Sequence, residues 1–435
     1  MTWGLVFRAR QRWGGSLWFV PFLGAVLGPV LGQLTLWLDR TVRLPAAWQY
    51  SASTATGVLT VIVGAMVGLL GFVVTISVLV VQMATGTLSP RFMRLWYRDL
   101  LQKLVLATFT GTLTFSYSLL RHVEADSVPD VGVTVAGLAV AASLLLLLLY
   151  LDRFTHSLRP VAVAALVAGA GRRVVEASTV RSLVTTGVAD RNSSATNSIA
   201  PSMVVRTKRS GAIQAIDGRG LVALARRRGS ALVLPYAIGD FVAAGTGVIE
   251  VFGTESTMVA RRLRRMLVLG RERTIEQDPA FALRILVDIA IRALSPAVND
   301  PTTAVQVLDY IEDLLLVIGR RELGGRGELR DGEGRTRVVI PVRRWEEFLE
   351  LGVTEIRVYG ATSVQVARRL RALLEGLRAV VRPEHRGAVD DELCRLEASV
   401  ADGFPAPDQA FAGISDRQGI GGPARLIARR GAPSA

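Results

Sequence analysis

The sequence contains few of the residues that bind metal ions or form disulfides. Among its 435 residues, Cys394 is the single cysteine and only three are histidines. One cysteine forms neither an intramolecular disulfide nor a cysteine metal cluster. The histidines are scattered along the chain, at positions 122, 156 and 385. We therefore expect no bound metal ion and no disulfide.

Sequence motifs for catalysis are missing as well. Residues 324–334 are rich in glycine and charge, yet they lack the G-x-x-x-x-G-K-[ST] pattern that cradles phosphate groups, and we interpret them as an exposed loop. Asp309, Glu312 and Asp313 have no histidine or activated nucleophile beside them, which indicates a solvated acidic helix face. The sequence favours a protein that is not an enzyme and that uses no cofactor.

Four long apolar stretches fill the first third of the chain. A helix needs about 20 mostly apolar residues to cross the hydrocarbon core of a bilayer. The third stretch is the shortest, and a few flanking residues bring it to that length. We expect a membrane α-helical domain of four transmembrane helices within residues 1–157, at 16–38, 54–83, 105–120 and 131–151.

Basic residues lie on alternate sides of these stretches. They precede the first stretch, separate the second from the third, and follow the fourth, while the two other loops hold few of them. Because loops rich in arginine and lysine stay in the cytoplasm, we expect both termini to be cytoplasmic. The clusters are Arg8, Arg10 and Arg12, then Arg91, Arg94, Arg98 and Lys103, then Arg153, Arg159, Arg172 and Arg173.

The four stretches contain almost no ionisable residues, which disfavours a pump or a proton-coupled carrier. A passive pore lined by hydroxyls, small side chains and backbone is compatible with this composition. The second stretch holds a G-x-x-x-G pattern, which lets two helices approach closely, and polar residues follow it. Its residues either line a pathway or pack helices together: Gly64, Gly68, Thr75, Ser77 and Gln82.

The formal net charge of +14 predicts acidic partners. For a membrane protein with basic cytoplasmic loops, anionic lipids of the inner leaflet are the favoured partner, ahead of nucleic acid. We expect anionic lipids at the cytoplasmic face, no nucleic acid, and assembly into a homo-oligomer.

The rest of the chain predicts a cytoplasmic α+β part. We expect a membrane-exit helix and linker over 158–200, a small β-rich module over 201–256, a mostly helical domain over 257–404 and a disordered tail over 405–435. The predicted strands are 203–206, 211–216, 231–234, 247–251 and 336–341, and the predicted helices are 221–227, 345–358, 363–381 and 389–400.

Two Asp-Pro pairs mark helix starts within the helical domain. In each pair the aspartate caps the helix and proline presets the backbone at the first helical position, so helices begin at Pro279 and Pro301. Arg284, Asp288 and Arg292 recur every four residues and predict a charged ladder on the first of these helices.

The loop between these two helices has two interpretations. Ser295, Asn299 and Asp300 either line a ligand site or shape a tight helical hairpin. The spacing of the residues is compatible with both.

Five short segments carry a family resemblance. They are Val80-Val81-Gln82, Ser89-Pro90-Arg91, Arg271-Glu272-Arg273-Thr274, Gln277-Asp278-Pro279 and Ala293-Leu294-Ser295-Pro296-Ala297-Val298-Asn299-Asp300-Pro301. Together they resemble a bacterial family of predicted membrane proteins, domain of unknown function twenty-two fifty-four. The resemblance runs from the first apolar stretch to about residue 400. It implies four membrane spans followed by a cytoplasmic domain, and it brings no established activity.

We expect an oligomeric inner-membrane protein whose cytoplasmic domains gate or regulate a passive membrane pathway. The alternative is a membrane-anchored sensor or scaffold that binds a cytoplasmic partner or small ligand. Self-association with a continuous polar path favours the first function, and a cytoplasmic pocket favours the second.

Overall fold

The computed structural model describes residues 3–4, 7, 16–41, 45, 48–87, 99–125, 127–157, 159–177, 200–253 and 257–421. Its contacts divide the chain into two compact units. The N-terminal unit is Ala9–Ala162, and the C-terminal unit is Met1–Arg8 together with Val163–Ala435. The predicted linker and its polar run at 190–198 lie outside the described residues.

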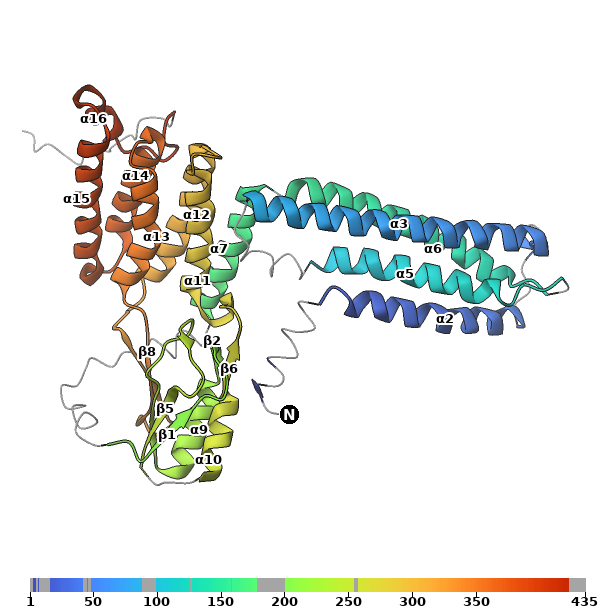
Figure 1. Ribbon diagram of the computed structural model, residues 1–435, viewed down its shortest axis with the longest axis horizontal. Coiled ribbons are helices and arrows are strands. Elements are labelled where there is room, and N and C mark those ends of the chain that lie inside the picture. The colour runs from blue at the N-terminus through green and yellow to red at the C-terminus, as the bar shows by residue number, and fades with distance from the viewer. Residues whose placement is uncertain are drawn as a thin grey trace, which may run out of the picture. The chain divides into compact units, whose positions relative to one another are not determined.

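Four long helices run side by side in the N-terminal unit (Figure 1). Three of them contain segments that are long and apolar enough to cross a membrane: Phe19–Asp39, Ala52–Leu79 and Asp130–Arg153. The predicted third span, 105–120, forms a helix but is not among these segments. Every second residue from Thr108 to Ser118 is a threonine or serine, and the hydroxyl groups lower the hydropathy of this helix. The helices are α2 Phe19–Asp39, α3 Ala52–Thr87, α5 Leu100–Leu120 and α6 Asp130–Ser157.

Helix α5 contacts all three of its neighbours, α2, α3 and α6. Apolar residues from α3, α5 and α6, including Met66, Phe115 and Ala136, form a shared core. Four polar residues of α5 are buried too: Gln102, Lys103, Thr112 and Ser116. Because polar side chains are tolerated in an apolar bundle when they face other protein, the central position of α5 explains its mixed composition.

The close approach of α2 to α5 depends on glycine. Gly24, Gly28 and Gly32 are spaced four residues apart, so they lie on one face of α2. A Cβ added at Gly24 would overlap the carbonyl oxygen of Ala107, and one at Gly28 would lie 2.5 Å from the carbonyl oxygen of Gly111. Small residues are what allow two membrane helices to pack this closely.

Helix α7, Pro160–Glu176, lies in the predicted exit segment and belongs to the C-terminal unit from Val163 onward. Gly171 of α7 packs against Ala282 of α11 and Leu314 of α12. Arg172 Nη1 donates to Asp313 Oδ1 of α12 at 2.8 Å. A helix that follows α6 in sequence is thus held by the helical part of the C-terminal unit.

Two small sheets follow, a five-stranded sheet of order β1-β5-β3-β8-β7 and a three-stranded sheet of order β4-β2-β6. The pairing of β3 with β8 is parallel, with Leu232 opposite Val338, and the other pairings are antiparallel. Helix α9, Gly218–Arg228, buries Leu221 and Leu224 in the apolar core that it shares with β3, β5 and β8. The strands are β1 Met203–Arg206, β2 Gly211–Ile216, β3 Ala231–Val233, β4 Phe241–Val242, β5 Gly247–Phe252, β6 Leu267–Gly270, β7 Arg326–Arg330 and β8 Thr336–Pro341.

The predicted strands and the helix of this module are confirmed, and two predictions need correction. Residues 324–334 are not simply an exposed loop, because Arg326–Arg330 forms strand β7 and pairs with β8. The module also extends beyond 201–256, because β6, β7 and β8 join its sheets. These additions come from pairings between segments distant in sequence, which local periodicity does not indicate.

Helices α11 to α16 form the other half of the C-terminal unit, whereas α10 lies beside α9 in the sheet module (Figure 1). The tail prediction is wrong for residues 405–421, since helix α16 contacts α14 and α15, and Asp416 pairs with Arg368 at 3.1 Å. Residues 422–435 lie outside the described part of the chain. The helices are α10 Thr257–Met266, α11 Pro279–Ala293, α12 Pro301–Gly319, α13 Trp345–Tyr359, α14 Val364–Val380, α15 Arg386–Gly403 and α16 Ala406–Ala412, with short 3-10 turns η4 Ile275–Gln277 and η5 Pro383–His385.

The glycine contacts of α2 give a stability prediction. Gly24→Ala should destabilise the N-terminal unit by roughly 1–3 kcal/mol, because the new methyl group meets rigid backbone of α5. Gly137→Ala of α6 is the matched control, since a Cβ there meets no described atom within 4 Å, and alanine in a helix is otherwise favourable. Thermal unfolding in detergent measures both, and equal stability of the two variants would contradict the assignment.

Candidate functional site

The predicted loop between α11 and α12 is a tight hairpin. The carbonyl oxygen of Ser295 accepts from the backbone N–H of Asn299 at 2.8 Å, and the Asp300 N–H donates to the Ala293 carbonyl at 2.7 Å. Asp300 Oδ1 accepts from the Thr303 N–H at 3.0 Å, which caps α12 as predicted. Asn299 has a φ of 48°, in the left-handed region that asparagine tolerates. Ser295 and Asp300 therefore shape the hairpin.

The other predicted cap, Asp278, is also part of a buried ion pair. Its Oδ1 caps α11 at the Phe281 N–H, 3.1 Å away, and its Oδ2 accepts from Arg273 Nε at 2.9 Å and Nη2 at 2.7 Å. The Asp278 side chain is 4% exposed, and burial raises the pKa of this carboxyl group while Arg273 opposes the shift. The pair holds the start of α11 beside Gly239, whose missing side chain leaves room for the carboxylate.

The predicted charged ladder on α11 is partly realised. Arg284 pairs with Asp288 at 2.7 Å and also with Glu355 of α13. Hydrogen bonding to Glu355 raises the pKa of the Arg284 guanidinium. Arg292 joins no ion pair among the residues that the structure describes. The ladder therefore crosses from α11 to α13 instead of continuing along α11.

The predicted solvated acidic face of α12 is wrong for Glu312, whose side chain is 7% exposed, whereas Asp309 and Asp313 are 56% and 48% exposed. Glu312 is buried and lies 2.5 Å from Arg369 Nη2 of α14, and Asp309 lies 2.9 Å from the same guanidinium. Asp313 pairs with Arg172 of α7. Because each carboxylate meets an arginine from another helix, these residues join helices together.

The candidate pathway residues of α3 divide between two faces. Ser77 points into the bundle, where its Oγ accepts from Gln102 Nε2 of α5 at 2.9 Å. Gly64, Gly68, Thr75 and Gln82 are exposed. A Cβ added at Gly64 or Gly68 would meet no described atom within 4 Å, so these glycines do not pack helices of the described chain together.

Sequence reasoning missed polar residues that accompany Ser77. Gln102, Lys103 and Tyr150 are each 4% exposed or less and lie on the helices that flank α3. Lys103 is predicted as a loop charge because it precedes the third apolar stretch, 105–120. Helix α5 begins earlier, at Leu100, so Lys103 lies within the helix and is buried.

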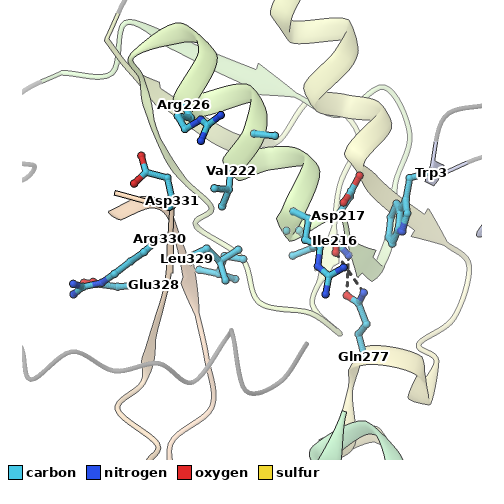
Figure 2. A pocket seen from close by; sticks show the side chains of 15 residues that line it. Trp3, Ile216, Asp217, Val222, Arg226, Gln277, Glu328, Leu329, Arg330 and Asp331 are labelled. Atoms are coloured by element: carbon cyan, nitrogen blue, oxygen red, sulfur yellow. Dashed lines mark hydrogen bonds and ion pairs between the residues drawn. The ribbon is translucent and has the colours of Figure 1, made fainter. Parts of the chain in front are cut away.

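A pocket of about 760 Å³ lies in the C-terminal unit between α9 and the β7–β8 hairpin (Figure 2). Val222 and Arg226 of α9 face it from one side, and Leu329 and Asp331 of the hairpin face it from the other. Apolar and polar groups are mixed along its wall: Trp3, Ile216, Asp217, Gly218, Arg219, Val222, Ala223, Arg226, Gln277, Glu328, Leu329, Arg330, Asp331, Gly332 and Ile340.

Internal contacts fix the acidic groups of the pocket wall. Asp331 accepts from Arg337 Nε at 2.6 Å and from two backbone N–H groups of its turn, and the Arg337 hydrogen bond lowers the pKa of this carboxyl group. Asp217 caps α9 through the Gly220 N–H at 2.9 Å. Arg219 and Arg226 join no ion pair within the described chain. The wall thus presents cations whose charge is not neutralised by a described neighbour.

One sequence feature, which the sequence analysis does not use, indicates the hairpin wall of this pocket. Asp331-Gly332 is the dipeptide typical of hairpin turns, and it stands between the two strands that form the hairpin wall.

The described residues include no group of three or more His, Cys, Asp or Glu side chains arranged to hold a metal ion.

The two Asp-Pro caps predict different responses to asparagine. Asp300→Asn should be tolerated, whereas Asp300→Ala should cost about 1 kcal/mol, because asparagine also caps helices. Asp278→Asn should cost roughly 2–3 kcal/mol, because it leaves Arg273 without its charged partner in a buried site, although Arg273 keeps some solvent contact. Chemical unfolding measures each variant, and native stability of Asp278→Asn would contradict this role of the pair.

Comparison with known proteins agrees with the membrane assignment. The model of the predicted membrane protein family DUF2254 matches residues 14–376. Uncharacterized proteins of Mycobacterium bovis and Mycobacterium tuberculosis are each 30% identical over 424 residues, which cover 93% of this chain and 78% of the relative. No solved structure matches the chain. This chain, with its apolar helices and its α+β unit, belongs to the DUF2254 family of predicted membrane proteins.

Proposed function

We propose that this protein is a membrane-anchored sensor whose C-terminal unit binds a small ligand on the cytoplasmic side. The pocket between α9 and the β7–β8 hairpin carries this proposal. Its volume of about 760 Å³ falls in the range of small-molecule sites, which are typically about 300–1,000 Å³. Its wall combines apolar side chains with charged ones, and placed polar groups are what fix the orientation of a ligand in such sites.

The position of the pocket supports a sensing role. Its two walls come from parts of the chain that are more than a hundred residues apart, α9 and the hairpin that leads into α13. A ligand that contacts both walls stabilises the arrangement in which they lie together. Helix α13 in turn pairs with α11 through Glu355 and Arg284. A change in the hairpin on ligand binding can therefore reach α11 through direct contacts of α13.

Helix α7 supplies the connection to the membrane helices. It starts at Pro160, directly after α6 ends at Ser157, and it is held by α11 and α12 through Gly171 and Arg172. A shift of α11 or α12 on ligand binding would thus act on a helix that is covalently continuous with the last apolar helix.

The membrane part of the proposal has four spans. Helix α5 is central among α2, α3 and α6, and this position supports its crossing the bilayer with them. The distribution of basic residues supports cytoplasmic termini and location in the bacterial plasma membrane. Anionic lipids at that face remain the expected lipid partner.

A matched pair of tryptophan variants tests ligand binding. Gly332 lies in the pocket wall, Gly387 lies outside it, and at both positions a Cβ meets no described atom within 4 Å. The purified full chain is screened against cytoplasmic small molecules by thermal shift. A binder should raise the Tm of the native protein and of Gly387→Trp, but not of Gly332→Trp, because the indole fills the pocket. The proposed site would be rejected if the screen finds no binder, or if a binder raises the Tm of Gly332→Trp as much as that of the native protein.

The second candidate is an oligomeric, channel-like assembly with a passive pathway, and an exposed stripe on α3 favours it. Gly57, Gly64, Gly68, Gly71 and Thr75 are all exposed and recur on one face of the helix, with Gln82 on the same line. Exposed small residues on a membrane helix suit close packing against another helix, such as α3 of a second copy.

Flux measurements in liposomes test this second candidate. The native protein should pass ions or small solutes, and Gly68→Leu or Gln82→Leu should reduce that flux by blocking the stripe. Val67→Leu is the control, because Val67 is 56% exposed on the same helix but lies off the stripe. Absence of flux under voltage, osmotic downshift and ligand addition, together with a monomeric mass, would rule the assembly out.

A further inference from the structure

Eight arginines gather on two neighbouring helices of the C-terminal unit. Helix α9 and helix α10 contact each other, and neither contains an acidic residue. Their apolar residues, Leu221, Leu224 and Leu263, are buried in the core of the module. We call the outward arginines the arginine surface: Arg219, Arg226, Arg227, Arg228, Arg261, Arg262, Arg264 and Arg265.

The arginine surface is not neutralised by the described part of the chain. None of the ion pairs among the described residues involves these eight arginines. Several other arginines of the unit are paired, as Arg273 is with Asp278 and Arg369 with Glu312. Like charges on adjacent helix turns repel one another, and an anion held between them removes that cost.

Four of these arginines surround a hollow of about 530 Å³ where α9 and α10 meet. They are Arg227, Arg261, Arg262 and Arg265. The hollow and the pocket next to the hairpin share Trp3, Asp217 and Ala223 in their walls, so they adjoin. One part of this double cavity is mixed in polarity, and the other is strongly cationic.

We propose that the ligand of the pocket is a nucleotide with more than one phosphate, and that its phosphates occupy the arginine hollow. This inference rests on the proposed function and names the class of ligand. Guanidinium groups match phosphate oxygens with paired hydrogen bonds, and four of them neutralise a polyphosphate. Trp3 at the shared wall offers an aromatic face for a base. Asp217, also at that wall, has a carboxylate that accepts from ribose hydroxyl or base amino groups.

A pair of charge-matched variants tests the phosphate site in the full chain. Arg261→Gln/Arg265→Gln removes two arginines of α10 from the wall of the hollow. The control, Arg228→Gln/Arg264→Gln, removes one arginine of α9 and one of α10, both outside that wall. The probes are inorganic tripolyphosphate, adenosine triphosphate, guanosine triphosphate and adenosine, measured by calorimetry in a neutral detergent. The first variant should bind the tripolyphosphate and the triphosphates about tenfold more weakly or worse, and the control should stay within about twofold.

Further arms separate this inference from its alternatives. At least one nucleoside triphosphate should bind more tightly than tripolyphosphate, and Gly332→Trp should remove that difference while keeping tripolyphosphate binding. Equal losses in both double variants would show a diffuse basic surface and overturn the hollow as a site. Binding only to vesicles of phosphatidylcholine with phosphatidylglycerol would overturn the nucleotide in favour of lipid headgroups.

The two proposals fail in different ways. If an uncharged compound binds and only Gly332→Trp abolishes its binding, the sensor pocket stands and the nucleotide inference falls. If no nucleotide and no tripolyphosphate binds while the thermal screen finds other ligands of the pocket, the sensor pocket again stands and the nucleotide inference falls. If tripolyphosphate binds at the hollow but nothing enters the pocket, the proposed sensor function falls together with the nucleotide.

Discussion

The C-terminal unit depends on the parallel pairing of β3 with β8. Leu232 of β3 lies opposite Val338 of β8, and this contact joins two strands that are about a hundred residues apart in sequence. The pairing completes the five-stranded sheet and places the β7–β8 hairpin opposite α9. Without it the pocket has only one wall. Closing so long a loop costs entropy, which the burial of Leu232, Val338 and Ile340 in one core offsets.

Arginine pairs then fix the helices of this unit to one another. Arg172 joins α7 to α12, Arg284 joins α11 to α13, and Arg369 joins α14 to α12. The guanidinium group suits this task because its planar array of donors engages two carboxylates at once, as Arg369 does with Asp309 and Glu312. Breaking the buried pair of Arg369 with Glu312 leaves an uncompensated charge, so this pair sets the arrangement of α14 and α12 more than it adds net stability.

The N-terminal unit follows a different rule, because its helices meet through small and hydroxyl-bearing residues. Gly24 and Gly28 bring α2 onto α5, and Ser77 joins α3 to α5 through Gln102. An apolar environment gives little hydrophobic drive for helices to associate, so close packing and interhelical hydrogen bonds contribute instead. Helix α5 carries several of these hydroxyl-bearing residues, and it contacts α2, α3 and α6.

The sequence by itself determined the local elements of this protein. Asp278-Pro279 and Asp300-Pro301 mark the starts of α11 and α12, because capping and proline geometry act within one turn. The alternating segments at 203–206 and 211–216 are strands at those positions, and the longest apolar stretches are helices, because side-chain periodicity is a local property. The family resemblance at 293–301 lies within the matched region.

Only the tertiary structure decided which elements meet. Glu312 is predicted to lie on a solvated face, but it is buried because Arg369, about sixty residues later, packs against it. Residues 326–330 are predicted to be part of a loop, but they form strand β7 because β8 pairs with them on one side and with β3 on the other. The pocket and the arginine hollow arise from the same cause, since their walls combine Trp3, α9, α10 and the hairpin. Such contacts depend on the free energy of the whole packed unit, which no local pattern encodes.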